Sequence, residues 1–302
     1  MVLNYNGKEL LAECLPSFAE AVKNSKNECT LSIVDNKSED GSVEFLKEKF
    51  PEFNVYVTDE NRVLCSFNEM VENSKADILI LMNNDIKVDK NFIDPLVEHF
   101  TDSKVFYAAP KVLNFDGTFN GGKSYLSMKY GIMKVNIDKE TYDEQGITHT
   151  IGCGAFRKDN FLKLGGYDPI YLPGYWEDTD ICYRGLKEGL KGIYEPKSMI
   201  YHKEHSSFSK SFSWYKKMSI VDRNMFIFMW KNINDTVLWI KHIIFVIPHV
   251  LVAAICGKSH LLVGFFKALS KIPQIIKRRR AAKESFLVND RDIISADRKL
   301  NR

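Results

Sequence analysis

A continuous apolar run at 77–82 (DILILM) ends directly in the polar triplet Asn83-Asn84-Asp85. The run has the length and composition of a strand buried on both faces, which is typical of parallel sheets. Strand-like runs at 30–34 and 53–57 precede it, and helical patterns separate these runs. This alternation predicts a doubly wound α/β sheet, because successive parallel strands need a helical crossover between them.

Two acidic clusters stand where chemistry is expected in such a sheet. Ligands of open α/β sheets bind beyond the carboxyl ends of the strands, so Asp85 is placed to meet a metal-bound diphosphate. The second cluster, at 177–180, follows Tyr175 and Trp176 at the start of a helical segment. Its carboxylates could accept a proton from a hydroxyl group. The two clusters together provide the minimum for metal-assisted transfer of a group from a nucleotide.

The bulk composition is that of an ordinary globular protein. The chain has 302 residues, of which 45% are hydrophobic and 27% charged, which is enough for a sizeable core. The net charge is only +3, so overall electrostatics do not indicate nucleic-acid binding. The six cysteines lack a C-x-x-C or metal-finger spacing, which is typical of reduced thiols in the cytosol. We see no basic start followed by an apolar run, and therefore expect no secretory signal.

Seven short motifs follow one another along about the first 230 residues. They are Asn4-Tyr5-Asn6-Gly7, Val34-Asp35-Asn36-Lys37-Ser38-Glu39-Asp40-Gly41-Ser42, Leu81-Met82-Asn83-Asn84-Asp85, Gly152-Cys153-Gly154-Ala155, Gly165-Gly166-Tyr167-Asp168, Trp176-Glu177-Asp178-Thr179-Asp180 and Tyr201-His202. Their order and spacing resemble the inverting family-2 glycosyltransferases of the GT-A fold, above all the rhamnosyltransferase-like members. The resemblance implies a Rossmann-like mixed sheet flanked by helices, with a catalytic domain at 1–230. Beyond it, the sequence pattern itself predicts a C-terminal helical, membrane-associating region at 231–302.

The resemblance assigns the nucleotide-sugar donor to residues at the strand ends. The positions that hold the nucleobase and ribose in the family match Asn4, Tyr5, Asn6, Asp35 and Asn36. From the pattern alone, the segment 35–41 favours a plain turn. Arg62 is implied to face the diphosphate, although the bulkier Val63 departs from the family's pattern at the next position.

The Asn-Asn-Asp triplet occupies the place of the family's D-x-D motif. The resemblance implies that Asp85 ligates Mg²⁺ or Mn²⁺, hard cations that prefer carboxylate and phosphate oxygens. Asn83 and Asn84 would contact the donor. His202 stands where relatives place a metal-ligating histidine, with His205 as the alternative. From the residue types alone, a polar cap at a strand end and a structural histidine are the simpler interpretations.

Glu177 and Asp178 are the candidates for the catalytic base. Asp178 matches the usual base of the family, and Glu177 would position the acceptor or the base. Tyr175 and Trp176 offer flat faces for the sugar ring of an acceptor and could raise the pKa of the neighbouring carboxyl groups by desolvation. Gly154 would let the acceptor approach the backbone. Without the resemblance, acids that stabilise a helix dipole are the simpler interpretation.

The C-terminal region combines an apolar run with a basic segment. Residues 243–256 form a 14-residue run that is apolar except for Pro248 and His249, and 258–283 contains eight Lys and Arg but no Asp or Glu. A spanning helix needs about 20 apolar residues, so we predict an interfacial helix and a polybasic patch on anionic lipid. The alternative is a helix packed on the catalytic core. On the interfacial interpretation, deletion of 237–302 should leave a soluble catalytic domain.

The sequence therefore predicts a metal-dependent inverting glycosyltransferase, a peripheral protein at the cytoplasmic face of a bacterial inner membrane. It would move a sugar from a nucleoside diphosphate donor, with dTDP-rhamnose as the candidate, to a lipid-linked or polysaccharide acceptor of surface glycan synthesis. A sugar nucleotidyltransferase is one alternative, although 6–8 (NGK) is too sparse for its phosphate loop. A non-catalytic scaffold of a polysaccharide assembly complex is the other. We expect no nucleic-acid partner, because the basic residues of the tail are interleaved with aliphatic residues and not with exposed aromatic and polar residues that could read a nucleic acid.

Overall fold

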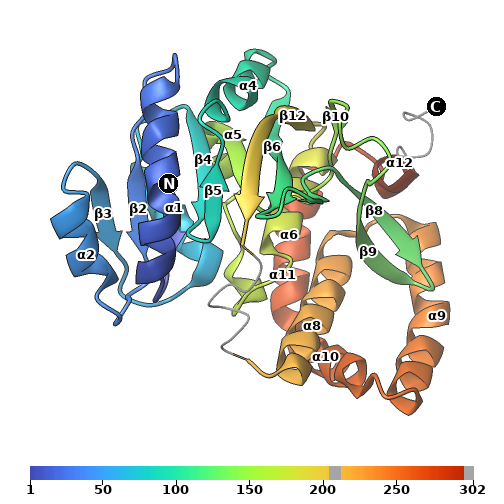
Figure 1. Cartoon of the computed structure of the whole chain (residues 1–302). Coiled ribbons are helices and arrows are strands. Elements are labelled where there is room, and N and C mark those ends of the chain that lie inside the picture. The colour runs from blue at the N-terminus through green and yellow to red at the C-terminus, as the bar shows by residue number, and fades with distance from the viewer. Residues whose placement is uncertain (204–211, 296–302) are drawn as a thin grey trace.

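One large mixed sheet organises the molecule (Figure 1). The computed structural model describes residues 1–203 and 212–295, and within them ten strands form this sheet. The strand order is β10-β12-β6-β11-β4-β1-β2-β3, with β5 paired to β12 and β7 paired to β6. The strands are β1 (Val2–Asn4), β2 (Ser32–Asp35), β3 (Asn54–Val57), β4 (Ile78–Asn83), β5 (Ile86–Val88), β6 (Val105–Asn114), β7 (Phe119–Gly121), β10 (Gly146–Ile147), β11 (Gly154–Arg157) and β12 (Lys191–His202).

The sheet is parallel in its first half and mixed in its second. β1 pairs in parallel with both β2 and β4, and β2 with β3. β11 then runs antiparallel between β4 and β6, while β12 lies parallel to β6. The mixed sheet flanked by helices is thus confirmed.

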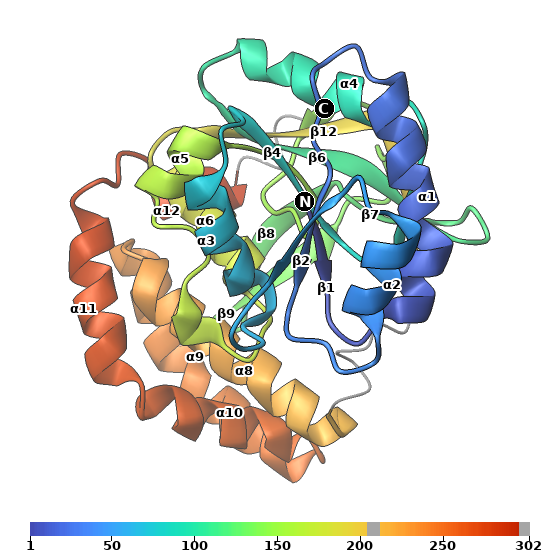
Figure 2. The same ribbon diagram turned by 90° about the vertical axis from the view of Figure 1, so that its left-hand side faces the viewer.

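Helices cover both faces of the sheet (Figure 2). One layer contains α1 (Lys8–Asn24), α2 (Ser42–Lys49) and α4 (Ile93–Glu98), and the other contains α3 (Phe67–Asn73), α5 (Lys158–Lys163) and α6 (Glu177–Lys187). Each layer encloses its own apolar core against the strands. Short 3-10 turns at Val63–Ser66, His99–Thr101 and Pro169–Tyr171 complete the connections. Pro16 lies inside α1, which continues through it as one helix.

A third apolar core joins the C-terminal helices to the rest of the molecule. These helices are α8 (Trp214–Asn232), α9 (Thr236–Ile255), α10 (Ser259–Leu269), α11 (Ile272–Lys283) and α12 (Asp290–Ser295). Their buried faces pack with α6 and with a separate hairpin formed by β8 (Ser124–Lys129) and β9 (Ile132–Ile137). The boundary predicted between residues 230 and 231 falls inside α8.

A buried ion pair also joins α12 to α6. Asp290 of α12 is 1% exposed and accepts hydrogen bonds from the Tyr183 hydroxyl (2.6 Å) and the Lys187 ammonium group (2.8 Å). Deletion of 237–302 would remove the counter-ion of Lys187 and the helices that cover the apolar core shared with α6 and α8, and exposure of such a core is destabilising. The structure therefore does not support the expectation that this deletion leaves an intact catalytic domain.

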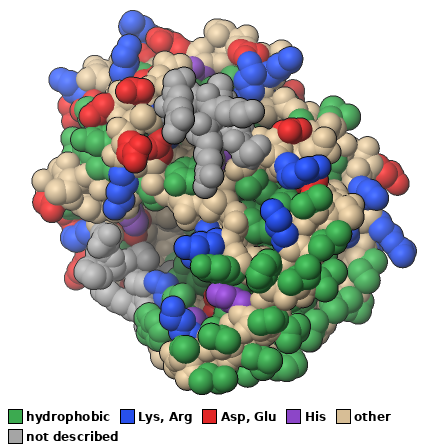
Figure 3. Space-filling model, turned by 90° about the vertical axis from the view of Figure 1, so that its right-hand side faces the viewer, with side chains coloured by type: hydrophobic (Ala, Val, Ile, Leu, Met, Phe, Trp, Pro, Cys, Tyr) green, Lys and Arg blue, Asp and Glu red, His purple; other side chains and the backbone are tan. Residues whose placement is uncertain are grey.

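Helix α9 is apolar on both sides, but only one side packs on the protein. Its buried side consists of Leu238, His242, Val246, Val250 and Ala253. The residues that are exposed on the other side are Val237, Ile240, Ile243, Ile244, Phe245, Ile247, Leu251, Val252 and Ile255. Hydrophobic side chains accordingly gather along the lower right of the face shown in Figure 3. Within the described residues, α9 alone has the length and composition of a membrane-crossing helix, and 28% of its most apolar stretch is buried.

The imidazole of His242 fixes α9 to the protein. Its Nδ1 lies 2.6 Å from the carbonyl oxygen of Gly131 at the tip of the β8–β9 hairpin, and its Nε2 accepts a hydrogen bond from the Trp230 indole (2.8 Å). Since Nε2 accepts, Nδ1 is the donor, and the neutral ring has both nitrogens bonded. Burial lowers the pKa of His242, in keeping with a neutral ring.

Candidate active site

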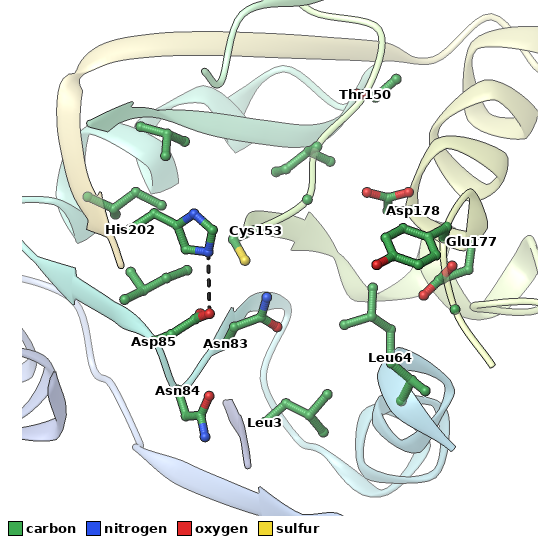
Figure 4. A pocket seen from close by; sticks show the side chains of 18 of the residues that line it. Leu3, Leu64, Asn83, Asn84, Asp85, Thr150, Cys153, Glu177, Asp178 and His202 are labelled. Carbon is green, nitrogen blue, oxygen red and sulfur yellow. Dashed lines mark ion pairs between the residues drawn. The ribbon is translucent and has the colours of Figure 1, made fainter. Parts of the chain in front are cut away.

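A cavity of about 450 Å³ lies at the carboxyl ends of β1 and β4 (Figure 4). The residues predicted from the sequence that line it are Asn4, Tyr5, Asn36, Asn83, Asn84, Asp85, Tyr175, Trp176, Glu177, Asp178 and His202. Four other predicted residues do not line it: Asn6, Asp35, Arg62 and Gly154. The fold thus brings most of the predicted site residues to one place from strand ends and turns far apart in the sequence.

Asn4 organises the floor of the cavity at the end of β1. This fully buried side chain donates to Asp35 Oδ2 (2.7 Å) and to Ser38 Oγ (3.2 Å), and its Oδ1 accepts from the Asn84 amide (2.6 Å). The Asp35 carboxylate also accepts from the Ser38 backbone N–H (2.7 Å). Asp35 therefore lies behind Asn4, outside the cavity lining, and its contact with a nucleobase stays a prediction.

The neighbouring turns place Asn6 and Arg62 at the exposed edge of this region. Asn6 Oδ1 accepts from the Glu39 backbone N–H (2.8 Å), which links two loops outside the cavity. Arg62 is half-exposed, and its Nε lies 3.5 Å from Glu60. The next residue, Val63, lines the cavity with a left-handed backbone (φ 51°), which is a rare conformation for a β-branched side chain.

Asp85 and His202 face each other across the turn that follows β4. β5 starts directly after Asp85 and pairs with the end of β12, so that Ile86 lies opposite His202. The Asp85 Oδ2 and His202 Nε2 atoms are 3.4 Å apart (Figure 4). Both carboxylate oxygens of Asp85 are buried, and neither has a hydrogen-bond partner. Buried polar groups are nearly always satisfied, so this carboxylate is suited to a cation.

The donor set around Asp85 fits a divalent metal that is shared with a ligand. A carboxylate and an imidazole are suitable ligands for Mn²⁺ and related ions. Within 1–203 and 212–295, no group of three or more His, Cys, Asp or Glu side chains could hold a metal ion by itself. The remaining ligands would therefore be phosphate oxygens and water. His205, the alternative ligand, lies outside the described residues.

Glu177 and Asp178 lie on the opposite side of the cavity, at the first turn of α6 (Figure 4). Burial raises the pKa of Glu177 to about 8, helped by repulsion from the Asp178 and Asp180 carboxylates. Burial also raises the pKa of Asp178, opposed by hydrogen bonds from the Thr179 backbone N–H (2.6 Å) and hydroxyl group (3.3 Å). The pair is therefore suited to hold one proton near neutral pH, which is a property of acid–base sites.

The turn before α6 carries the two aromatic residues that were predicted for the acceptor. Tyr175 (φ 72°) and Trp176 (φ 74°) both have left-handed backbones, a strained conformation for residues other than glycine. Both line the cavity, and the Trp176 ring also packs 5.0 Å from the ring of Phe228 in α8.

Gly154 has a packing role in β11. A Cβ atom there would lie 2.3 Å from Ile151 Cδ1 and 2.6 Å from the Ala108 carbonyl oxygen. The space beside Gly154 is thus filled by the core, and its contact with an acceptor stays a prediction. The preceding residues Gly152 and Cys153 line the cavity instead, and Cys153 lies between the two acidic sites in Figure 4.

Comparison with known proteins identifies the family. The profile of Glycosyl transferase family 2 matches residues 1–165, more than half of the chain. The chain belongs to glycosyl transferase family 2. The matched part of this family 2 glycosyltransferase contains Asn4 and Asp85 but ends before the turn and acids at 175–178 and before His202. The fold places these later residues in the same cavity as Asn4 and Asp85.

Curated relatives of this glycosyltransferase are similar over part of their length. Rhamnosyltransferase WbbL of Escherichia coli (strain K12) is 33% identical over 98 residues, which are 30% of this chain and 37% of that protein. A pre-mycofactocin glycosyltransferase of Mycobacterium tuberculosis (strain H37Rv) is 20% identical over 128 residues, which are 42% of this chain and 27% of that protein. The chain thus spans only about a third of the length of these relatives.

Solved structures show that the glycosyltransferase has the GT-A fold. GalNAc-T7 with UDP, GalNAc and Mn²⁺ aligns with a TM-score of 0.58 at 16% identity over 76% of this chain and 47% of that one. The mannosyltransferase PcManGT from Pyrobaculum calidifontis, in complex with GDP-Man and Mn²⁺, aligns with a TM-score of 0.54 at 12% identity over 90% of this chain and 74% of that one.

Several cavity residues carry no recognisable signal in the sequence. They are Leu64, Ser124, Ile137 and Thr150, of which Ser124 and Ile137 pair across the root of the β8–β9 hairpin. The hairpin has an ordinary alternating composition, so only its packing reveals that it forms part of the cavity wall.

We predict that Glu177→Gln removes a pH-dependent loss of stability. A carboxyl group with a pKa of about 8 when folded and 4.5 when unfolded binds more protons in the folded state. Its contribution to the free energy of unfolding is complete below pH 4.5 and is lost as the pH rises through about 8. Each pKa unit of difference between the folded and unfolded states corresponds to about 1.4 kcal/mol in the free energy of unfolding.

Urea unfolding of wild type and Glu177→Gln across this pH range would check this prediction, with the exposed Glu144→Gln as control. The wild type and the control should lose stability toward pH 8 more steeply than Glu177→Gln. Three parallel profiles would mean that Glu177 is already ionised in the folded protein.

Proposed function

We propose that this family 2 enzyme catalyses metal-dependent, inverting transfer of a sugar from a nucleoside diphosphate donor to an acceptor hydroxyl group. One observation carries the proposal: a single cavity has the buried Asp85 carboxylate, which accepts no hydrogen bond from the described residues, beside His202 at one side and the Glu177–Asp178 pair, suited to hold a proton, at the other. The first pair suits a metal and a diphosphate, and the second suits a hydroxyl nucleophile.

The donor would occupy the side of the cavity at the strand ends. Asn4, Asn36 and Asn83 would contact the nucleoside, and Asp85 with His202 would hold Mg²⁺ or Mn²⁺ at the diphosphate. When bound, the metal would neutralise the negative charge of the leaving group. The Mn²⁺ in both structural neighbours supports this assignment.

Asp178 would act as the base at the other side of the cavity. Its carboxylate takes the proton of the acceptor hydroxyl as the oxygen bonds to the anomeric carbon. The bond from that carbon to the diphosphate breaks on the opposite face, so the configuration inverts and the nucleoside diphosphate leaves. Glu177, protonated at neutral pH, could donate a hydrogen bond to a sugar hydroxyl, and the rings of Tyr175 and Trp176 would flank the acceptor.

The similarity to a rhamnosyltransferase supports rhamnose as the sugar to test first. We propose dTDP-rhamnose as the first donor to test and a lipid-linked or polysaccharide acceptor of bacterial surface glycans. Nucleotide sugars with dTDP, UDP and GDP should be screened with Mn²⁺ for binding and slow hydrolysis. Binding of one donor class followed by transfer is the expected result. If no nucleotide sugar binds, the transferase proposal fails and the scaffold alternative gains support.

We further propose that α9 lies in the interface of a cytoplasmic, anionic bilayer surface. Its exposed apolar side faces away from the protein, and His242 keeps the opposite side docked. Two of the eight basic residues at 258–283 are used inside the protein: Arg278 pairs with Asp168 (2.9 Å), and Arg279 donates to the Trp230 carbonyl oxygen (2.9 Å). The other six are exposed or partly exposed, and we propose these six, fewer than the sequence indicated, as contacts for lipid headgroups.

Asp178→Asn should leave donor binding nearly intact and lower transfer by about 10²-fold or more, because a positioned base contributes on that order. Steady-state kinetics with a verified acceptor would measure this, with the exposed Asp159→Asn as control. Near-normal turnover of Asp178→Asn would assign the base role to Glu177.

Asp85→Ala should abolish the metal dependence of nucleoside diphosphate binding, since the diphosphate then lacks its bridging cation. Calorimetric titration of the nucleoside diphosphate with and without Mn²⁺ would test this. His202→Ala should weaken the dependence less, because Asp85, phosphate oxygens and water remain as ligands. Equal affinity of the wild type in both conditions would contradict a metal site.

The full chain should sediment with anionic vesicles, less so at high salt, because salt screens the basic residues but not the apolar helix. The triple variant Ile243→Gln/Ile247→Gln/Leu251→Gln should reduce sedimentation at every salt concentration. Val57→Gln, an exposed apolar position on β3, is the matched control. A wild type that ignores vesicles would contradict the interfacial role of α9.

A further inference from the structure

The turn at 174–176 needs support from outside its own segment. Gly174 (φ 133°), Tyr175 (φ 72°) and Trp176 (φ 74°) have positive φ angles in succession directly before Glu177. Two of the three carry large side chains, for which this conformation is unfavourable. Such a turn persists only where surrounding contacts hold it.

Asn224 of α8 supplies these contacts. Its side-chain amide nitrogen lies within hydrogen-bond distance of the carbonyl oxygens of Tyr171 (2.6 Å), Gly174 (2.7 Å) and Tyr175 (2.9 Å), so its two N–H groups are shared among three acceptors, and the side chain is fully buried. Its Oδ1 accepts from Arg223 Nε (2.8 Å), which fixes the orientation of the amide. The guanidinium group of Arg223 in turn donates to the carbonyl oxygen of Leu172 (2.6 Å).

A second contact from the same helix holds the first turn of α6. The Lys231 ammonium group lies 2.9 Å from Asp180 Oδ2 and 2.7 Å from Asp168 Oδ2. Asp180 stands two residues after Asp178 on α6. Helix α8 therefore holds the segment with the proposed base on both sides: Asn224 before it and Lys231 after it.

We propose that Asn224 is a positioning residue for sugar transfer: by bonding the carbonyl oxygens of the left-handed turn, it sets the side chains of Tyr175, Trp176 and Asp178 against the acceptor. This inference rests on the proposed transferase function. Asn224 does not line the cavity, so it acts through the turn and not on the substrate.

The donor side of the cavity, in contrast to the acceptor side, is held by elements other than α8. Asn4, Asn84 and Asp85 are held by β1, β4 and β12, and none of the hydrogen bonds recorded for these three residues comes from α8. Loss of the Asn224 amide should therefore affect the acceptor and the chemical step, while donor binding persists.

The experiment uses the full chain with Asn224→Asp and Asn224→Ala. The first variant keeps the size of the side chain but has no N–H donor when ionised, and the second removes the whole amide. The control is Ser219→Ala, which removes a buried hydroxyl group of α8 that bonds the Lys216 carbonyl oxygen and not the turn.

The first measurement, hydrogen exchange of the backbone amides, does not depend on activity. Both Asn224 variants should exchange faster across 171–178 while β1 and β4 stay as in the wild type, and Ser219→Ala should leave 171–178 unchanged. Unchanged exchange across 171–178 in both Asn224 variants would overturn the proposal. So would loss of protection throughout the molecule, since Asn224 would then serve the whole fold.

The second measurement separates the kinetic constants. Both Asn224 variants should lower kcat for transfer by about 10- to 100-fold and raise KM for the acceptor, as expected when reacting groups are misplaced by about 1 Å. The affinity for the nucleoside diphosphate with Mn²⁺ should stay within twofold of the wild type, an expectation that a general loss of structure would not meet. Wild-type kcat in both Asn224 variants would overturn the proposal. If the wild type transfers no sugar, the proposed function fails, while the exchange experiment still decides whether Asn224 holds the turn.

Discussion

The buried carboxylate of Asp180 is the interaction on which the C-terminal half of the structure depends. It accepts hydrogen bonds from the Tyr171 hydroxyl (2.7 Å), Arg184 Nε (2.8 Å), the Lys231 ammonium group (2.9 Å) and the Asn232 amide (2.7 Å). Although burial acts to raise its pKa, Lys231 and Arg184 hold the pKa of Asp180 well below its usual range. A charge so deeply buried is tolerated only when it is fully paired, so α6 and α8 must meet in one arrangement.

The first turn of α6 holds one acidic side chain in its ionised form and another in its protonated form. Asp180 is ionised because two cations and two neutral donors surround it, whereas Glu177 favours its protonated form because it is buried beside other carboxylates, with one oxygen unbonded. The structural carboxylate of Asp180 thus lies only three residues after the proton-holding carboxyl group of Glu177. The environment, and not the residue type, assigns the two roles.

The parts of the site that could be predicted from the sequence are those set by strand ends. The apolar run of β4 and the triplet after it place Asp85 at the edge of the sheet, because parallel strands present their carboxyl ends together. The partners of the acidic cluster could not be predicted, since Lys231 and Asn224 lie about 50 residues further along the chain in a helix of ordinary composition. For the same reason the sequence does not distinguish Arg278 and Arg279 from the exposed basic residues beside them, although these two bond to Asp168 and to the Trp230 carbonyl oxygen.

The β8–β9 hairpin contacts both the cavity and helix α9, two features that are far apart in the sequence. The root of the hairpin contributes Ser124 and Ile137 to the cavity wall. The carbonyl oxygen of Gly131 at its tip bonds His242 of α9. A six-residue strand is about 20 Å long, which is the separation between root and tip. The hairpin thus has one end at the cavity and the other end on α9. The hydrogen bond between Gly131 and His242 therefore joins the hairpin that forms part of the cavity wall to the helix with the exposed apolar side.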